Sequence, residues 1–406
     1  MLALLPSAGI FWGGLDSFAG QDVVGLAYGL MLALALYALA PSPRFWRATG
    51  PVLALMVAAL VWLMAVSLGW LGNRPIASDI APPGLVGLGG LIAALLCGAL
   101  LGYRRVDLAR IADGMLVLGS LSVLWALSIG GDIASPAGME MGEGRFLGTL
   151  ANANASATVF VGLAGLALAR ALRSGASSRT RTSAWEQLRT VAYGIVVLLM
   201  LGATLLTGSR NGSVIGALVV GLMVWRGLGG RASLRVVGPM LAVILLLVIL
   251  LFSGVVFERF QQLPAEASVR LTIWRHSAAI VANSPLTGYG IGSFSLASAH
   301  ALDDVRQAQT LWMVNSPHNI VLRLLIDGGW PYLLLVTAAL LGIAATVVRH
   351  ARRYGLDIVE WGFVGAVSAA IASSQVDLAL EFPAIAAGTM TWIGLLWGRA
   401  IGARTA

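Results

Sequence analysis

Long runs of apolar residues, separated by short polar links, dominate the hydropathy pattern of the chain. A bilayer core of roughly 30 Å needs about 20 apolar residues in one helix, and eleven runs approach that length. They lie near residues 23–40, 51–72, 84–102, 111–129, 153–172, 190–207, 212–225, 236–256, 331–348, 359–376 and 383–398. The pattern predicts an all-α polytopic membrane protein with about 11–12 transmembrane helices.

The first 15 residues are also apolar, but Pro6 and the pair Gly13 and Gly14 interrupt them. They are predicted to form either a twelfth, imperfect span or a re-entrant segment. No positively charged region precedes them, so a cleaved signal peptide is not expected.

One segment between the runs, residues 257–330, is long enough to fold outside the membrane. It contains several aromatic residues, which a purely solvated linker rarely does. We therefore expect short helices packed on the outer face of the membrane that the chain spans. The chain is predicted to consist of N-terminal transmembrane helices (residues 1–256, with 8–9 spans), a periplasmic loop (257–330) and C-terminal transmembrane helices (331–406, with 3 spans).

The composition supports a membrane protein, and the distribution of charged residues predicts how the chain is oriented in the membrane. Of the residues, 58% are hydrophobic and 11% charged, the net charge is +8, and every basic residue is an arginine. Arginine-rich links alternate with arginine-poor ones. Because cytoplasmic loops carry the excess of basic residues, the long loop is predicted to face outward and the C-terminus to face the cytoplasm. Membrane lipids are expected partners and nucleic acid is not.

Candidate polar residues gather on the predicted outer side, first within residues 144–156. Arg145, Asn152 and Asn154 lead there into an apolar run. Either asparagine fits an ordinary helix cap. Two amide side chains two residues apart also suit sugar hydroxyls, so all three residues are candidate substrate contacts.

A second candidate is Arg210, in a turn between two apolar runs. One interpretation is that Arg210 reaches lipid headgroups. The other is an anion site, because a helix N-terminus and a fixed guanidinium together suit a phosphate.

The long loop adds Arg270, Arg275 and Tyr289 as candidate substrate contacts. If residues 267–276 are helical, Arg270 and Trp274 share one face; an amphipathic helix on the membrane surface would look the same. The glycine-rich stretch around Tyr289 allows close backbone approach, but it lacks the strand and lysine of a nucleotide-binding loop.

His318 follows Ser316 and Pro317 at the start of an apolar run. Serine caps helices and proline is favoured at the first helical position. We therefore expect His318 in the first turn, where the helix dipole disfavours imidazolium. A neutral imidazole can accept a proton, although a histidine with only a structural hydrogen bond fits the pattern too.

Several kinds of chemistry have no motif in this sequence. There is no paired-carboxylate metal motif, and His276, His300 and His318 lack the spacing of a zinc site. A P-loop and a serine elbow are also missing. The reaction is expected to need no metal and no cofactor, and to use cations and one base.

Taken in order, these motifs resemble the bacterial O-antigen ligase and polymerase superfamily, which uses polyprenyl-diphosphate-linked glycans. The stretches that carry the resemblance are residues 146–154, 207–212, 270–274, 284–294, and His318 with Gly329. The resemblance implies a glycosyltransferase of the bacterial inner membrane, with its active site on the periplasmic face and an undecaprenyl-diphosphate-linked glycan as donor. It further implies that Arg210 and Arg270 bind the diphosphate and that His318 is the general base.

The acceptor stays open at this point. It is lipid A-core for a ligase, and another lipid-linked glycan for an O-antigen or exopolysaccharide polymerase; one dominant outer loop favours the ligase. Direct attack on the donor predicts inversion. A transporter of lipid-linked sugars is an alternative of another class, in which ionisable groups lie near the bilayer midplane. Asp113 and Asp327 are the main acidic exceptions within or beside the apolar runs, and Asp327 is expected to pair with Arg323.

Overall fold

The computed structural model describes residues 9–10, 17–72, 75–128, 145–150, 152–177, 184–227, 263–284, 286–302, 305–312 and 314–402. Within these ranges the regular elements are all helices, which confirms the predicted class. Seven of these helices are long and apolar enough to cross a membrane. They are α2 (Phe18–Leu39), α3 (Pro43–Ser67), α4 (Ala81–Tyr103), α5 (Leu108–Ser128), α6 (Ala153–Ser177), α7 (Ala184–Leu206) and α14 (Ile320–Tyr354).

Three further helices coincide with predicted spans. These are α8 (Arg210–Gly227), α15 (Ile358–Ser373) and α16 (Pro383–Gly402). The predicted span at 236–256 and most of the first 15 residues lie outside the described residues.

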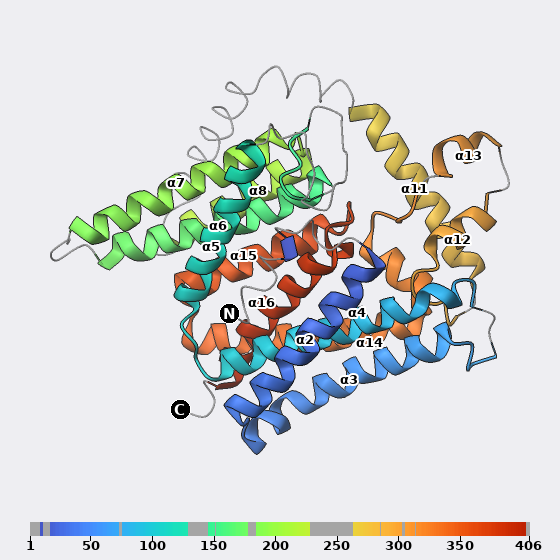
Figure 1. Cartoon of the computed structure of the whole chain (residues 1–406), viewed down its shortest axis with the longest axis horizontal. Coiled ribbons are helices and arrows are strands. Elements are labelled where there is room, and N and C mark those ends of the chain that lie inside the picture. Colours follow the sequence, from blue (N-terminus) through green and yellow to red (C-terminus); the bar gives the residue numbers. More distant parts are fainter. Residues whose placement is uncertain are drawn as a thin grey trace.

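The described part of the long loop contains helices, as predicted. It forms α11 (Leu263–Asn283), α12 (Phe294–His300) and α13 (Val305–Leu311). Figure 1 shows these three helices together at one end of the α2, α3, α4 and α14 group. Helix α14 begins inside the predicted loop; the division of the chain at 256 and 330 stays a prediction.

Glycines hold α16 tightly against α4. A Cβ atom added at Gly398 would lie 1.9 Å from the carbonyl oxygen of Ala99, and one added at Gly98 would lie 2.1 Å from that of Thr391. Small residues four apart allow such backbone contact between membrane helices. This contact holds α16 in place. The link of residues 374–382, which includes the short 3-10 helix η4 (Ala379–Glu381), joins α16 to α15.

Helix α14 bends at Gly329, whose φ of 66° and ψ of −167° are not helical. Pro331 follows and has no N–H to donate to the carbonyl of Asp327. The backbone N–H of Gly290 takes that place and donates to the Asp327 carbonyl at 2.9 Å. The glycine-rich loop 288–292 therefore packs onto the bend, which is the close backbone approach that its composition predicted.

Candidate active site

Side chains from three distant parts of the chain meet at the carboxylate of Asp377, between α15 and α16. Its Oδ2 accepts hydrogen bonds from Asn154 Nδ2 at 2.5 Å and from the guanidinium of Arg270 at 3.1 Å. Its Oδ1 accepts one from the backbone N–H of Leu378 at 2.8 Å and lies 3.7 Å from His318 Nδ1. The side chain of Asp377 is 1% exposed, whereas those of Arg270 and His318 are 33% and 25% exposed. The carboxylate is therefore covered, and the two basic groups around it are open to a ligand.

The surroundings of Asp377 keep this carboxyl group ionised. Burial alone would raise the pKa of Asp377. The contacts with His318, the backbone N–H of Leu378 and Arg270 outweigh burial and lower the pKa below its ordinary value of 3.8. At neutral pH a fixed negative charge stands between an arginine and a histidine.

His318 has a backbone conformation that is unusual for a residue with a Cβ atom. Its φ is 50°, in the left-handed region, which is sparsely populated and often found at functional sites. The prediction that Ser316 caps the helix and places His318 in its first turn is wrong: Asn319 is the cap, and α14 begins at Ile320. Asparagine caps helices as well as serine does. His318 thus precedes the helix, and its neighbour is Asp377.

The two asparagines at the start of α6 make different hydrogen bonds. Asn152 accepts hydrogen bonds from the backbone N–H groups of Asn154 and Ala155 at 2.9 and 3.0 Å, as an ordinary cap does. Asn154 reaches Asp377 instead. Arg145 supports it, donating to Asn154 Oδ1 at 2.9 Å and to the carbonyl of Thr207 at 2.8 Å. Arg145 therefore positions Asn154 against the end of α7.

Arg210 is the first residue of α8, next to this cluster. Ser209 caps the helix, because its Oγ accepts from the backbone N–H of Gly212 at 3.1 Å. Asn211 donates to Ser373 Oγ at 3.3 Å and so fixes this helix end beside α15. A cation at a helix N-terminus opposes the helix dipole, so helix stability does not explain Arg210. The anion site predicted at this helix end stays a prediction.

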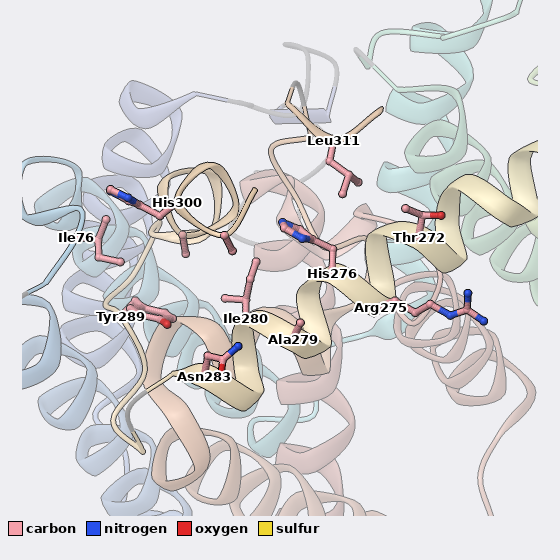
Figure 2. A pocket seen from close by; sticks show the side chains of 12 residues that line it. Ile76, Thr272, Arg275, His276, Ala279, Ile280, Asn283, Tyr289, His300 and Leu311 are labelled. Carbon is pink, nitrogen blue, oxygen red and sulfur yellow. The ribbon is translucent and has the colours of Figure 1, made fainter. Parts of the chain in front are cut away.

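Arg275 and Tyr289 line a different cavity, of about 790 Å³, between α11 and α12. Figure 2 shows that His276 and Ile280 point from α11 toward the α12 side, whereas the side chain of Arg275 extends away from them. His276 Nε2 lies 3.0 Å from Ser298 Oγ. Among the described residues that line this cavity, none contacts Asp377. The structure thus separates Arg275 and Tyr289 from the other predicted site residues.

A second polar cluster lies beside His318. Arg323 forms the predicted ion pair with Asp327, at 2.9 Å between Nε and Oδ2, and also pairs with Glu381 at 3.4 Å. The hydroxyl of Ser316 donates to Glu381 and accepts from the backbone N–H of His318 at 3.1 Å. Ser316 thereby joins the two clusters.

Sequence reasoning did not identify Asp377 or Glu381 as site residues. A signal was present, because both acids lie in the short link between the last two apolar runs, on the predicted side of the candidate arginines. In the described ranges, no group of three His, Cys, Asp or Glu residues is placed to hold a metal ion. The metal independence of the reaction stays a prediction.

These features define a polytopic helical membrane protein with a basic site where several helix ends meet. The model of the family described as O-Antigen ligase matches residues 195–337, which contain Arg210, Arg270 and His318. The match confirms the resemblance to the O-antigen ligase and polymerase superfamily. No curated protein sequence matches the chain. Asn154 and Asp377 lie outside the matched stretch.

Proposed function

We propose that the protein is a glycosyltransferase of the O-antigen ligase type. It transfers a glycan from an undecaprenyl-diphosphate donor to lipid A-core at the periplasmic face of the bacterial inner membrane. The observation that carries this proposal is the meeting of Arg270 and His318 at the buried carboxylate of Asp377. A fixed cation and a fixed proton acceptor side by side suit a reaction in which a diphosphate leaves and a hydroxyl attacks.

The arginines act on the leaving group. Negative charge grows on the diphosphate as the glycosidic bond breaks, so guanidiniums held in place stabilise the transition state more than the ground state. Arg270 is partly exposed and held by Asp377, and Arg210 adds the N-terminus of α8. Both residues present planar donors that match phosphate oxygens.

His318 acts on the acceptor. With a proton on Nδ1, directed to Asp377, the Nε2 lone pair is left to take the proton of the acceptor hydroxyl. The hydroxyl oxygen attacks the anomeric carbon, and the diphosphate leaves with the electron pair of the broken bond. A buried carboxylate that orients an imidazole in this way is known from catalytic triads. One displacement inverts the anomeric configuration.

The second candidate function is a polymerase, which has the same donor chemistry but takes another lipid-linked glycan as acceptor. A lipopolysaccharide gel of a deletion strain separates the two. Free core with accumulated long polymer supports the ligase, and core with a single repeat unit supports the polymerase.

The ionisable groups within the helices give a transporter less support than the site gives a glycosyltransferase. Asp113 pairs with Arg170 at 2.6 Å and accepts from Tyr193 at 2.8 Å, and Asp327 pairs with Arg323. In the described part of the chain both acids are thus held by partners in the same protein.

The test is glycan transfer by the purified protein, with a polyprenyl-diphosphate glycan and core lipopolysaccharide, in the presence of a chelator. His318→Ala should lower kcat by about 10²-fold to 10⁴-fold and leave donor binding intact. Arg270→Lys should also impair transfer, because an ammonium group cannot reproduce the planar fork.

Matched controls lie at the far end of the helices. Arg110→Lys changes a side chain that is 88% exposed, and His350→Ala changes a histidine near the other end of α14. Both should retain the wild-type rate. Full activity of His318→Ala and Arg270→Lys would overturn the assignment.

A further inference from the structure

A cavity of about 500 Å³ opens beside the Asp377 cluster, between α2, α4, α14 and the start of α16. This is within the usual range of small-molecule sites, about 300–1,000 Å³. Part of its wall is apolar. The polar residues that line it include Gln21, Asn315, Ser316, Arg323, Asp327 and Glu381.

The charge of this cavity differs from that of the neighbouring cluster. One guanidinium, Arg323, lies between two carboxylates, those of Asp327 and Glu381. With all three groups ionised, the cavity has a net charge of about −1, which disfavours a diphosphate. The cluster around Asp377 has no such negative excess, because Arg270 balances the one carboxylate and His318 is neutral as a proton acceptor. The two sides of His318 therefore suit different ligands.

Two oxygen atoms at this cavity have no hydrogen-bond partner within the described residues. Asp327 Oδ1 and Gln21 Oε1 are both buried and unpartnered. The side chain of Asp327 is 8% exposed, and the backbone N–H of Gly292 near its carboxylate does not reach Oδ1. Both oxygens can only accept hydrogen bonds, and leaving a buried acceptor unpaired is costly. A ligand that fits here must supply O–H or N–H donors.

Ser316 connects the cavity to the proposed base. Its hydroxyl lies between Glu381, in the cavity wall, and the backbone N–H of His318. A hydroxyl-rich ring held in the cavity would thus contact Ser316, two residues before the residue that removes a proton.

We propose that this cavity is the acceptor subsite, and that it holds the terminal sugar ring of the acceptor glycan. The proposal rests on the proposed function. Gln21 and Asp327 accept hydrogen bonds from hydroxyl groups of the ring, and one further hydroxyl faces His318. That hydroxyl gives its proton to His318 and forms the new bond to the anomeric carbon, while the diphosphate leaves on the arginine side.

The test separates the Michaelis constants of the two substrates. The purified protein is given a polyprenyl-diphosphate glycan and core lipopolysaccharide, and each is varied at a saturating level of the other. Gln21→Leu removes one unpartnered acceptor with little change in size. It should raise the KM for the core acceptor by about 3-fold to 10-fold and leave the donor KM and kcat unchanged. Asp327→Asn should raise the same constant.

Gln309→Leu is the matched control, because Gln309 is exposed on α13 and outside the cavity. It should change neither constant. If Gln21→Leu has the wild-type acceptor KM, or raises the donor KM instead, the assignment of the cavity as the acceptor subsite is wrong and only water fills the cavity. If the wild-type protein transfers no glycan to any acceptor, the proposed function itself fails. Gln21→Leu leaves the ion pairs of Arg323 with Asp327 and Glu381 in place. The subsite can therefore be tested with Gln21→Leu even if Asp327→Asn fails to fold.

Discussion

His318 Nδ1 lies 3.7 Å from Asp377 Oδ1, just beyond hydrogen-bond distance. The histidine is held from one side by its left-handed backbone and the Ser316 hydroxyl. The carboxylate is held from the other side by Arg270 and Asn154. Catalytic hydrogen bonds are often long before substrate binds and tighten in the complex. The separation of the pair therefore fits the proposed general base and its carboxylate partner.

Asp377→Asn should reduce kcat by about 10²-fold or more, because the amide can present its N–H to Nδ1 and favour the wrong tautomer of His318. The donor KM should rise as well, since Arg270 loses its carboxylate. Steady-state transfer kinetics measure both constants. Asp79→Asn, at an exposed acid on the same predicted side, should behave as wild type. A wild-type kcat for Asp377→Asn would contradict the orienting role.

The lowered pKa of Asp377 predicts how stability depends on pH. A group whose pKa is lower in the folded than in the unfolded state adds stability above the unfolded value and loses it as the pH falls through the folded value. The difference in Tm between wild type and Asp377→Asn should therefore be constant from neutral pH to about pH 5 and shrink only below the ordinary value of 3.8. Thermal unfolding in detergent at several pH values measures this difference. A difference that disappears near pH 6 would show that Asp377 is not an ionised partner of Arg270.

Gly329→Ala should destabilise the protein strongly. The positive φ alone costs about 1–3 kcal/mol for alanine. In addition, the new Cβ atom would lie 1.9 Å from the carbonyl oxygen of Leu286. Gly202→Ala is a matched control, because Gly202 lies within helix α7 and an added Cβ there meets nothing within 4 Å. Its effect should be at most about 1 kcal/mol, in the stabilising direction. Equal thermal stability of the two variants would mean that the bend in α14 relaxes easily.

Asp113→Asn should lower stability without lowering the transfer rate of the folded protein. The carboxylate makes two hydrogen bonds with Arg170, at 2.6 and 2.9 Å, and the Arg170 side chain is only 11% exposed. Because Asp113 itself is 38% exposed, solvent screens the pair, and we expect a loss of about 1–2 kcal/mol. Unfolding and transfer assays on the same preparation measure the two effects. Loss of transfer with full stability would instead point to a functional acid inside the bundle, as the transporter alternative requires.

The helices were predictable from the sequence because hydropathy is a local property. Apolar runs and helices coincide wherever the structure describes a predicted span. The start of α14 was not predictable locally, since Ser316 and Asn319 are both good caps. Distant contacts favour the second, because Asn319 Nδ2 donates to the carbonyl of Gln375 at 2.8 Å and the N–H of Ile320 donates to that of Ser374 at 2.9 Å.

The basic residues of the site could be predicted from the sequence, but the acidic residue at its centre, Asp377, could not. Arginine and histidine at the edge of an apolar run stand out as isolated polar groups. Asp377 lies in a short polar link, where an acid in contact with water looks the same as one that is buried. Its role depends on the packing together of α6, α11 and the residues before α14. No local sequence pattern predicts that arrangement.

The bend at Gly329 also resolves a problem of length. As a straight helix, the 35 residues of α14 would extend about 52 Å, well beyond the roughly 30 Å of hydrocarbon in a bilayer. Residues 330–354 alone extend about 37 Å, enough to cross with a modest tilt. The residues before the bend can then lie along the membrane surface. The ion pair of Arg323 and Asp327 belongs to that shorter arm, so the protein can bury two charges beside its site without carrying either one into the lipid tails.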